Sequence, residues 1–187
     1  MIDYFALLGL ERRPFIAEEC LKAAYLRQSE LVRSQTRDSE ALSSVNAAFH
    51  TLSNPAARVQ HLLNLEFGSA PGGRIGIEIG EVFGPVAEAV HMADREFGSL
   101  STQSSALLRA LAFRKMEGVR DKLEEVERGL ATRLERLLSE LQELDETWRN
   151  NPAQCRVRLA QIALRLTFVQ KWLNEVHERQ IRFEELA

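Results

Sequence analysis

Histidines and cysteines are the side chains in this sequence that could bind a metal ion or act as nucleophiles. No two histidines are four residues apart, the spacing that puts two imidazoles on one helix face for a metal. Cys20 and Cys155 are far apart in sequence, so they form neither a CxxC motif nor a disulfide framework within one chain. We therefore expect two small core cysteines, no metal site, and four surface or half-buried histidines: His50, His61, His91 and His177.

Carboxylates and glycines are the other groups that could form a reactive site. The acidic runs "KLEEVE" at 122–127 and "FEELA" at the end are interleaved with basic residues, a pattern typical of solvated helix faces rather than catalytic dyads. The segment "GSAPGGRIG" at 68–76 lacks the GxGxxG spacing and the Lys-Ser/Thr pair of phosphate-binding loops. We therefore expect no catalytic residues and no cofactor, and we do not expect an enzyme.

The composition restricts the fold and the partners. Of 187 residues, 45% are hydrophobic and 27% are charged, with five prolines and few aromatic residues, which favours an all-α protein. The net charge of −3 is spread evenly along the chain, so nucleic acid is not an expected partner. No apolar run is long enough to cross a membrane and the start does not resemble a signal peptide, so we expect no membrane partner and a cytoplasmic location.

The spacing of the apolar residues predicts helices along the chain, and four of these helices lie in residues 1–67. Asp3 is a suitable N-cap for a short first helix, and Gly9 is its natural end. Apolar residues at three- and four-residue spacing predict a second helix at about 17–34 and a third from about 39. The polar segment "RSQTRDS" at 33–39 joins these two helices, and Phe49 is expected to be buried between them, so that Phe49→Ala should cost about 3 to 5 kcal/mol.

The rest of the chain predicts an elongated three-helix bundle at 84–187, after a glycine-rich linker at 68–83. Gly84 and Pro85 predict either a helix start or a kink near 84. Apolar residues with 4-3 spacing then predict two long antiparallel helices, one at about 104–148 and one after "NNP" at 150–152, with Gln180 as the one polar residue in the seam of the last. The alternative is that a long seam pairs with another chain, giving a coiled-coil homodimer instead of a monomer.

Three quoted segments carry a family resemblance: "DYFALLGL", "LKAAYLRQSELV" and "SVNAAFHTLSNPAARVQHLL". They resemble the J domain of DnaJ-like co-chaperones, particularly the iron-sulfur assembly co-chaperone of the HscB type. The third is the most specific, since its residues match a family pattern close to "LNxAYxTLxxPxxRAxYLL". The later segments "LDETW" and "RLTFVQKWLNEV" resemble the end of the HscB client-binding bundle. The resemblance implies a J-domain-like unit at 1–67, followed by a bundle that binds a client.

The resemblance also implies a site at the end of the second helix. In that family a His-Pro-Asp tripeptide there makes a DnaK-type chaperone hydrolyse ATP, and the equivalent positions in this sequence are Arg33, Ser34 and Gln35. Ser34 cannot restrict the backbone as proline does, and Gln35 has no negative charge to pair with an arginine of the chaperone. We therefore expect the stimulation of ATP hydrolysis to be lost or weakened. The chaperone-facing residues implied are Lys22, Arg27, Arg33, Ser34 and Gln35.

A client-binding face is implied by the segment "IGEVFGPVAEAVHMADREF", which corresponds to the scaffold-binding helix of HscB. Its mixed apolar and acidic candidates are Val82, Phe83, Val86 and Glu88. The partners implied are a weakly bound DnaK-type chaperone and an IscU-type scaffold or another protein client. Three functions stay open on the sequence alone: an adaptor without ATPase stimulation, an active iron-sulfur co-chaperone, and a coiled-coil structural or dimerisation protein.

Overall fold

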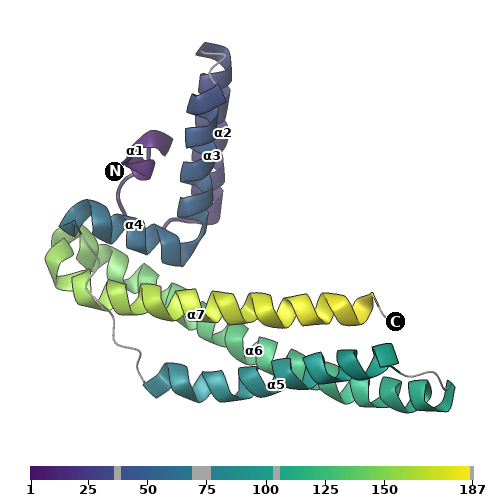
Figure 1. The fold of residues 1–187 in the computed structure, drawn as a ribbon. Helices are drawn as coiled ribbons and strands as arrows, with labels where there is room; N and C mark the ends of the chain where they lie inside the picture. Colours follow the sequence, from purple (N-terminus) through teal and green to yellow (C-terminus); the bar gives the residue numbers. More distant parts are fainter. Residues whose placement is uncertain (36–38, 69–76, 103–105, 186–187) are drawn as a thin grey trace. The chain divides into compact units, whose positions relative to one another are not determined.

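The computed structural model describes residues 1–35, 39–68, 77–102 and 106–185 (Figure 1). Every regular element in these ranges is an α-helix, so the predicted all-α fold is confirmed. The predicted loop residues 36–38 and linker residues 69–76 lie outside the described ranges, as do the side chain of Gln35 and those at 77–79 and 100–114.

The chain divides into two compact units that do not coincide with the predicted domains. The first unit contains Met1–Arg74 and Leu137–Leu166, and the second contains Ile75–Arg136 and Thr167–Ala187. The two long helices therefore contribute to both units. Their adjoining ends belong with the N-terminal helices, whereas the predicted boundary assigned all of 84–187 to the bundle.

Helix α1 (Tyr4–Leu8) has the predicted caps. The Asp3 carboxylate accepts hydrogen bonds from the backbone N–H groups of Phe5 and Ala6 at 3.0 and 3.1 Å. Gly9 ends the helix in the left-handed region at φ 68°, where a side chain would be strained. Phe5 and Leu8 are fully buried, so this short helix is held by packing rather than by its own length.

Helices α2 (Glu18–Gln35) and α3 (Ser39–Ser53) lie side by side as a hairpin (Figure 1). Leu21 and Ala24 of α2 are buried, as are Val45, Ala48 and Leu52 of α3, which follows the helical period of the sequence.

Phe49 is only half-buried, against the prediction, and its ring lies 4.4 Å from that of Tyr25. Because part of the Phe49 ring already contacts water, Phe49→Ala should cost less than the 3 to 5 kcal/mol given above for a fully buried phenylalanine.

Helix α4 (Pro55–Phe67) has Pro55 in its first turn, and the Asn54 side chain caps it by accepting the Ala57 N–H at 3.0 Å, as these residue types favour. Its residues Val59, Leu62 and Leu63 are fully buried. This face completes the small core formed by the N-terminal helices.

Helices α5 (Ile77–Thr102), α6 (Ala106–Asn150) and α7 (Pro152–Glu184) are the long elements (Figure 1). Within the second unit, the Phe97 ring of α5 lies 4.5 Å from that of Phe183 on α7. The apolar seams of α6 and α7 are largely buried inside the single chain, so the exposed stripe that a coiled-coil dimer needs is mostly covered. The seam residues with no more than 1% exposure are Leu123, Leu130, Leu141, Leu159, Ile162, Leu166 and Val176.

Helix α5 begins at Ile77, which corrects two predictions: residues 77–83 are helical rather than linker, and no helix starts near 84. Pro85 lies inside the helix and is exposed, as is Gly84. A proline there removes one backbone hydrogen bond, but the freed carbonyl of the preceding turn can bind water on this exposed side. Val82 and Val86 come before and after the proline in sequence and are 8% and 2% exposed. Their burial stabilises the helix across this position.

None of the described helices combines the length and apolar character that crossing a bilayer would require.

Candidate partner-binding surfaces

The outward face of α2 carries the predicted chaperone-facing cations. Lys22, Arg27 and Arg33 are all exposed, but Glu18, Glu19 and Glu30 are exposed as well. Lys22 forms an ion pair with Glu18 one turn earlier. This contact raises the pKa of Lys22 and lowers that of Glu18. The face therefore has no net charge and would steer an acidic partner only weakly.

Two large apolar side chains of α2 are also exposed. Leu26 is 64% exposed and Leu31 is 42% exposed, and each lies among the charged residues of α2. Leu26 lies opposite the buried Leu21 and Ala24, so its position on the helix would have placed it outward. Leu31 lies seven residues after Ala24, on the face whose spacing predicts burial, so its exposure differs from that expectation.

The positions that the resemblance equates with the tripeptide are helical, since α2 runs to Gln35, one residue beyond its predicted end at about 34. Arg33, Ser34 and Gln35 form the last turn of α2, and the Ser34 hydroxyl donates to the Leu31 carbonyl at 2.9 Å. A proline at 34 would disfavour the helical conformation of the residue before it. Because serine imposes no such restriction, the helix continues through positions where a His-Pro-Asp sequence would interrupt it.

We predict that Ser34→Pro shortens α2. The new proline lacks the N–H that bonds within the helix and restricts Arg33, so helical structure should end near Val32, at a cost of no more than ~3 kcal/mol because only the last turn is lost. Carbon chemical shifts in an NMR spectrum should show loss of helix at residues 33 to 35. Ser34→Ala is the control and should keep them helical. Helical chemical shifts at residues 33 to 35 in both variants would contradict the prediction that a proline at 34 ends the helix.

The base of the first unit is held by arginines from the segment after α1. Arg12 forms ion pairs with Asp3 at 2.8 Å and with Glu66 at 2.9 Å. Burial alone would raise the pKa of Asp3, but hydrogen bonds from the Ala6 N–H and Arg12 outweigh it and hold this pKa below its ordinary value. The next residue, Arg13, binds the Asp145 carboxylate of α6 through two nitrogens.

Trp148 adds to this contact between the N-terminal segment and α6. Its indole N–H donates to the Arg12 carbonyl at 2.8 Å, and its ring meets that of Phe67 edge-on, with centroids 6.2 Å apart. Asp145 and Trp148 are 3% and 4% exposed. These contacts explain why the adjoining ends of α6 and α7 belong to the first compact unit.

His61 is a buried hydrogen-bond acceptor rather than a metal ligand. The backbone N–H of Tyr4 donates to its Nε2 at 3.2 Å, and the two rings stack with centroids 4.7 Å apart. A protonated imidazole has no free lone pair for this bond. Burial lowers the pKa of His61, so the neutral form is favoured in the folded protein.

This arrangement predicts a loss of stability at mildly acidic pH. Because the folded-state pKa of His61 is lower than its ordinary value of 6.5, the unfolded chain takes up a proton first, and the free energy of unfolding falls as the pH drops below about 6.5. Urea titrations at pH 7.5 and at successively lower pH down to about 5, above the range where carboxylates titrate, should show the decrease. His61→Gln should flatten it, whereas His50→Gln should not. Equal pH dependence in all three proteins would refute this role.

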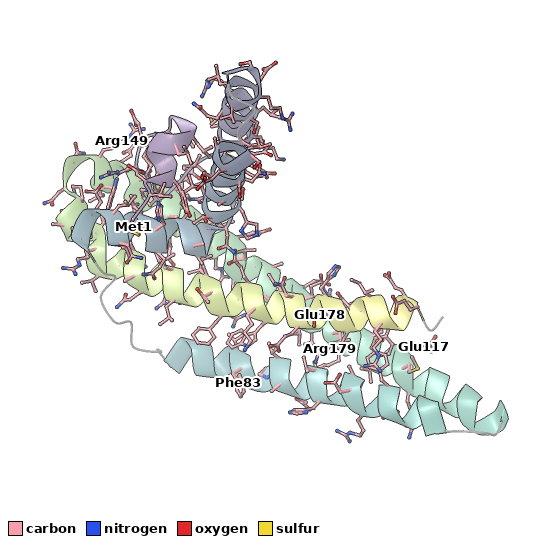
Figure 2. All side chains as sticks on the ribbon, turned by 45° about the horizontal axis from the view of Figure 1, so that its top comes forward. Met1, Phe83, Glu117, Arg149, Glu178 and Arg179 are labelled. Atoms are coloured by element: carbon pink, nitrogen blue, oxygen red, sulfur yellow. The ribbon has the colours of Figure 1, made fainter. Side chains whose placement is uncertain are left out.

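The second unit places only part of the predicted client-facing set on its surface. Val82 and Val86 are buried, which leaves them unavailable to a client, whereas Phe83 and Glu88 are exposed. Phe83 is labelled on α5 in Figure 2 and is 58% exposed.

The Phe83 ring lies 6.3 Å from that of Trp172 on α7, and the Phe168 ring lies 5.7 Å from Trp172. We call Phe83, Phe168 and Trp172 the aromatic ledge. Sequence reasoning missed the two α7 members, although both lie in "RLTFVQKWLNEV", the segment quoted above for its family resemblance.

The candidate metal ligands are not brought together. In the ranges that the structure describes, no group of three His, Cys, Asp or Glu side chains could hold a metal ion. Cys155 is buried, as predicted, and burial raises the pKa of its thiol. Cys20 is exposed on α2, so the prediction that it is a core residue is wrong.

Comparisons with known proteins support the fold. No protein-family model matches the sequence, and no curated protein matches it. Among solved structures, the chaperone HscB from Vibrio cholerae is similar, with a TM-score of 0.66 and 16% sequence identity over 97% of this chain and 99% of that one. The fold is HscB-like. The short N-terminal helices thus correspond to a J-domain-like arrangement and the long ones to a helical bundle, as the sequence resemblance implied.

Proposed function

We propose that this protein is a non-enzymatic, cytoplasmic adaptor of the HscB kind that has lost or weakened the stimulation of ATP hydrolysis. The observation that carries the proposal is the tip of the hairpin. Arg33, Ser34 and Gln35 continue α2 in the place of the His-Pro-Asp tripeptide. A helical turn without proline and without a carboxylate lacks both the backbone geometry and the charge that the tripeptide supplies.

The partners in this proposal are a DnaK-type chaperone and a protein client. The chaperone would meet the outward face of α2 through Lys22, Arg27 and the tip, weakly, because the neighbouring glutamates cancel the charge. The client would meet the aromatic ledge, where exposed Phe83 and buried Trp172 form an apolar anchor. The exposed Glu88 lies further along α5 and is proposed as a polar contact. An IscU-type scaffold is the client that the HscB-like fold suggests. Residues 1–67 are proposed as the J-domain-like part.

An active iron-sulfur co-chaperone is the second candidate. It is favoured by the exposure of Lys22, Arg27 and Arg33 along one helix, which keeps a cationic contribution on the surface that the chaperone would approach. The two candidates share partners and differ in whether the chaperone hydrolyses ATP faster.

Binding to purified partners tests the adaptor proposal. Biolayer interferometry should detect the DnaK-type chaperone and the IscU-type scaffold of the same organism. Phe83→Ala should weaken scaffold binding about tenfold, as expected for an aromatic anchor, and leave chaperone binding unchanged. Arg27→Glu should weaken chaperone binding and leave scaffold binding unchanged. Lys171→Glu on α7 makes the same change of charge elsewhere and should leave chaperone binding unchanged. Absence of binding to both partners would refute the adaptor function.

A further inference from the structure

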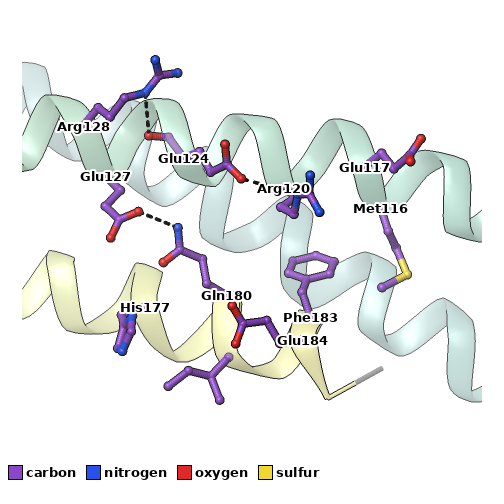
Figure 3. Close-up of a pocket in the computed structure, with 11 residues that line it drawn as sticks. Met116, Glu117, Arg120, Glu124, Glu127, Arg128, His177, Gln180, Phe183 and Glu184 are labelled. Atoms are coloured by element: carbon purple, nitrogen blue, oxygen red, sulfur yellow. Dashed lines mark hydrogen bonds and ion pairs between the residues drawn. The ribbon is translucent and has the colours of Figure 1, made fainter. Parts of the chain in front are cut away.

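A groove lies in the second unit, and none of its lining residues belongs to the aromatic ledge. It has a volume of about 630 Å³ and is lined by α6 and α7 (Figure 3). The α6 residues that line it run from Met116 to Arg128, which corresponds to roughly 18 Å of helix. We call this the Gln180 groove. Helix α5, which carries Phe83, contributes no lining residue among those described.

The groove forms where the apolar seam of α7 is interrupted. Gln180 occupies the seam position at which the sequence pattern expects a leucine, and its amide donates to the Glu127 carboxylate of α6 at 2.7 Å (Figure 3). A leucine here would pack between the two helices and exclude water. The polar pair instead lines the opening between the two helices.

The walls of the groove are acidic and its apolar surface is partly exposed. The lining includes four glutamates and two arginines. Arg120 pairs with Glu124 at 3.4 Å, whereas Glu117 and Glu184 form no ion pair within the described part of the chain. Met116 and Phe183 are 6% and 7% exposed, and Ile181 beside them is 43% exposed.

We propose that the Gln180 groove binds a basic amphipathic helix of a partner protein. Carboxylates on both helices would attract lysine or arginine side chains of the bound helix. The exposed Ile181 would contact an apolar side chain that lies between these cations on the same bound helix. The groove length matches about three turns of a bound helix. This inference does not depend on the hairpin tip or the aromatic ledge, so it can fail without affecting the proposed function.

Fluorescence anisotropy with a short amphipathic peptide of leucine and lysine tests the proposal. The natural protein should bind this peptide and should not bind the same peptide with glutamate in place of lysine. Glu117→Gln/Glu184→Gln should weaken binding about fivefold or more. The control Glu135→Gln/Glu143→Gln removes the same charge from exposed positions of α6 outside the groove and should bind normally. Equal affinities for both double variants would overturn the proposal, because the binding would then reflect net charge alone.

A second variant tests the opening itself. Gln180→Leu should complete the seam, raise the thermal unfolding temperature and weaken peptide binding by at least the same factor. Unchanged peptide binding by this folded variant would contradict a role for the opening. Sedimentation of the natural protein alone decides whether a second copy fills the groove. A dimer that Glu117→Gln/Glu184→Gln dissociates would overturn the assignment to a different protein, and a monomer supports it.

Discussion

Arg58→Ala is expected to lower the free energy of unfolding by about 3 kcal/mol. Arg58 is 4% exposed, and its Nε and Nη1 groups donate to the Pro14 and Leu52 carbonyls at 3.0 and 2.8 Å. Truncation leaves both acceptors without these bonds and opens a cavity, and hydrogen bonds from a charged donor are the stronger kind. The guanidinium thus connects the end of α3 to the segment that precedes α2.

Part of this loss is offset, because burying the guanidinium is itself unfavourable. Burial lowers the pKa of Arg58 to about 10, which shows that the surroundings penalise its charge. Arg58→Met keeps most of the stem and removes that penalty, so it should cost less than Arg58→Ala. Urea titrations give both values, with Arg27→Ala as an exposed control expected within ~0.5 kcal/mol of the natural protein. An Arg58→Ala cost below that of Arg27→Ala would contradict the buried role.

Trp148→Ala should be at least as damaging, at about 3 to 5 kcal/mol, because a buried indole is lost together with its hydrogen bond. Trp148 is 4% exposed and contacts the Phe67 ring and the Arg12 carbonyl. Its loss should loosen the N-terminal helices from the end of α6, since both belong to one compact unit.

A graded series separates packing from hydrogen bonding at this site. Trp148→Phe keeps an aromatic ring but loses the indole N–H. The lost hydrogen bond to the Arg12 carbonyl should account for about 1 kcal/mol of the destabilisation. Unfolding can be followed by circular dichroism in urea, because the fluorescence of Trp172 reports the other unit. Equal losses for the phenylalanine and alanine variants would show that the hydrogen bond, and not the ring packing, holds the contact.

Local signals in the sequence were sufficient for most helix boundaries. Asp3, Gly9, Asn54 and Pro55 act as the caps and breaks that their types predict. The start of α5 was predicted wrongly because tertiary packing decides it. Burial of the apolar residues before and after Pro85 outweighs the local effect of this proline. Helix propensity is a weak signal that packing overrides.

The site residues were less predictable than the helices. Val82 and Val86 were assigned to a client surface, yet they continue the stripe that includes Ala93 and Phe97, and this spacing was sufficient to place them in the core. The pairing of Arg13 with Asp145 could not be inferred, because the two residues are 132 positions apart and neither has a local signature. Contacts of this kind depend on the tertiary fold.

The proposed function requires that the helical turn at 33–35 does not trigger ATP hydrolysis by the chaperone. The most direct test is the single-turnover ATPase rate of the DnaK-type chaperone from the same organism, with an established J-domain protein as positive control. We predict that the natural chain leaves the rate within about twofold, and that Arg33→His/Ser34→Pro/Gln35→Asp raises it about tenfold, or ~1.4 kcal/mol in barrier height. Stimulation by the natural chain equal to that by the restored variant would contradict the claim.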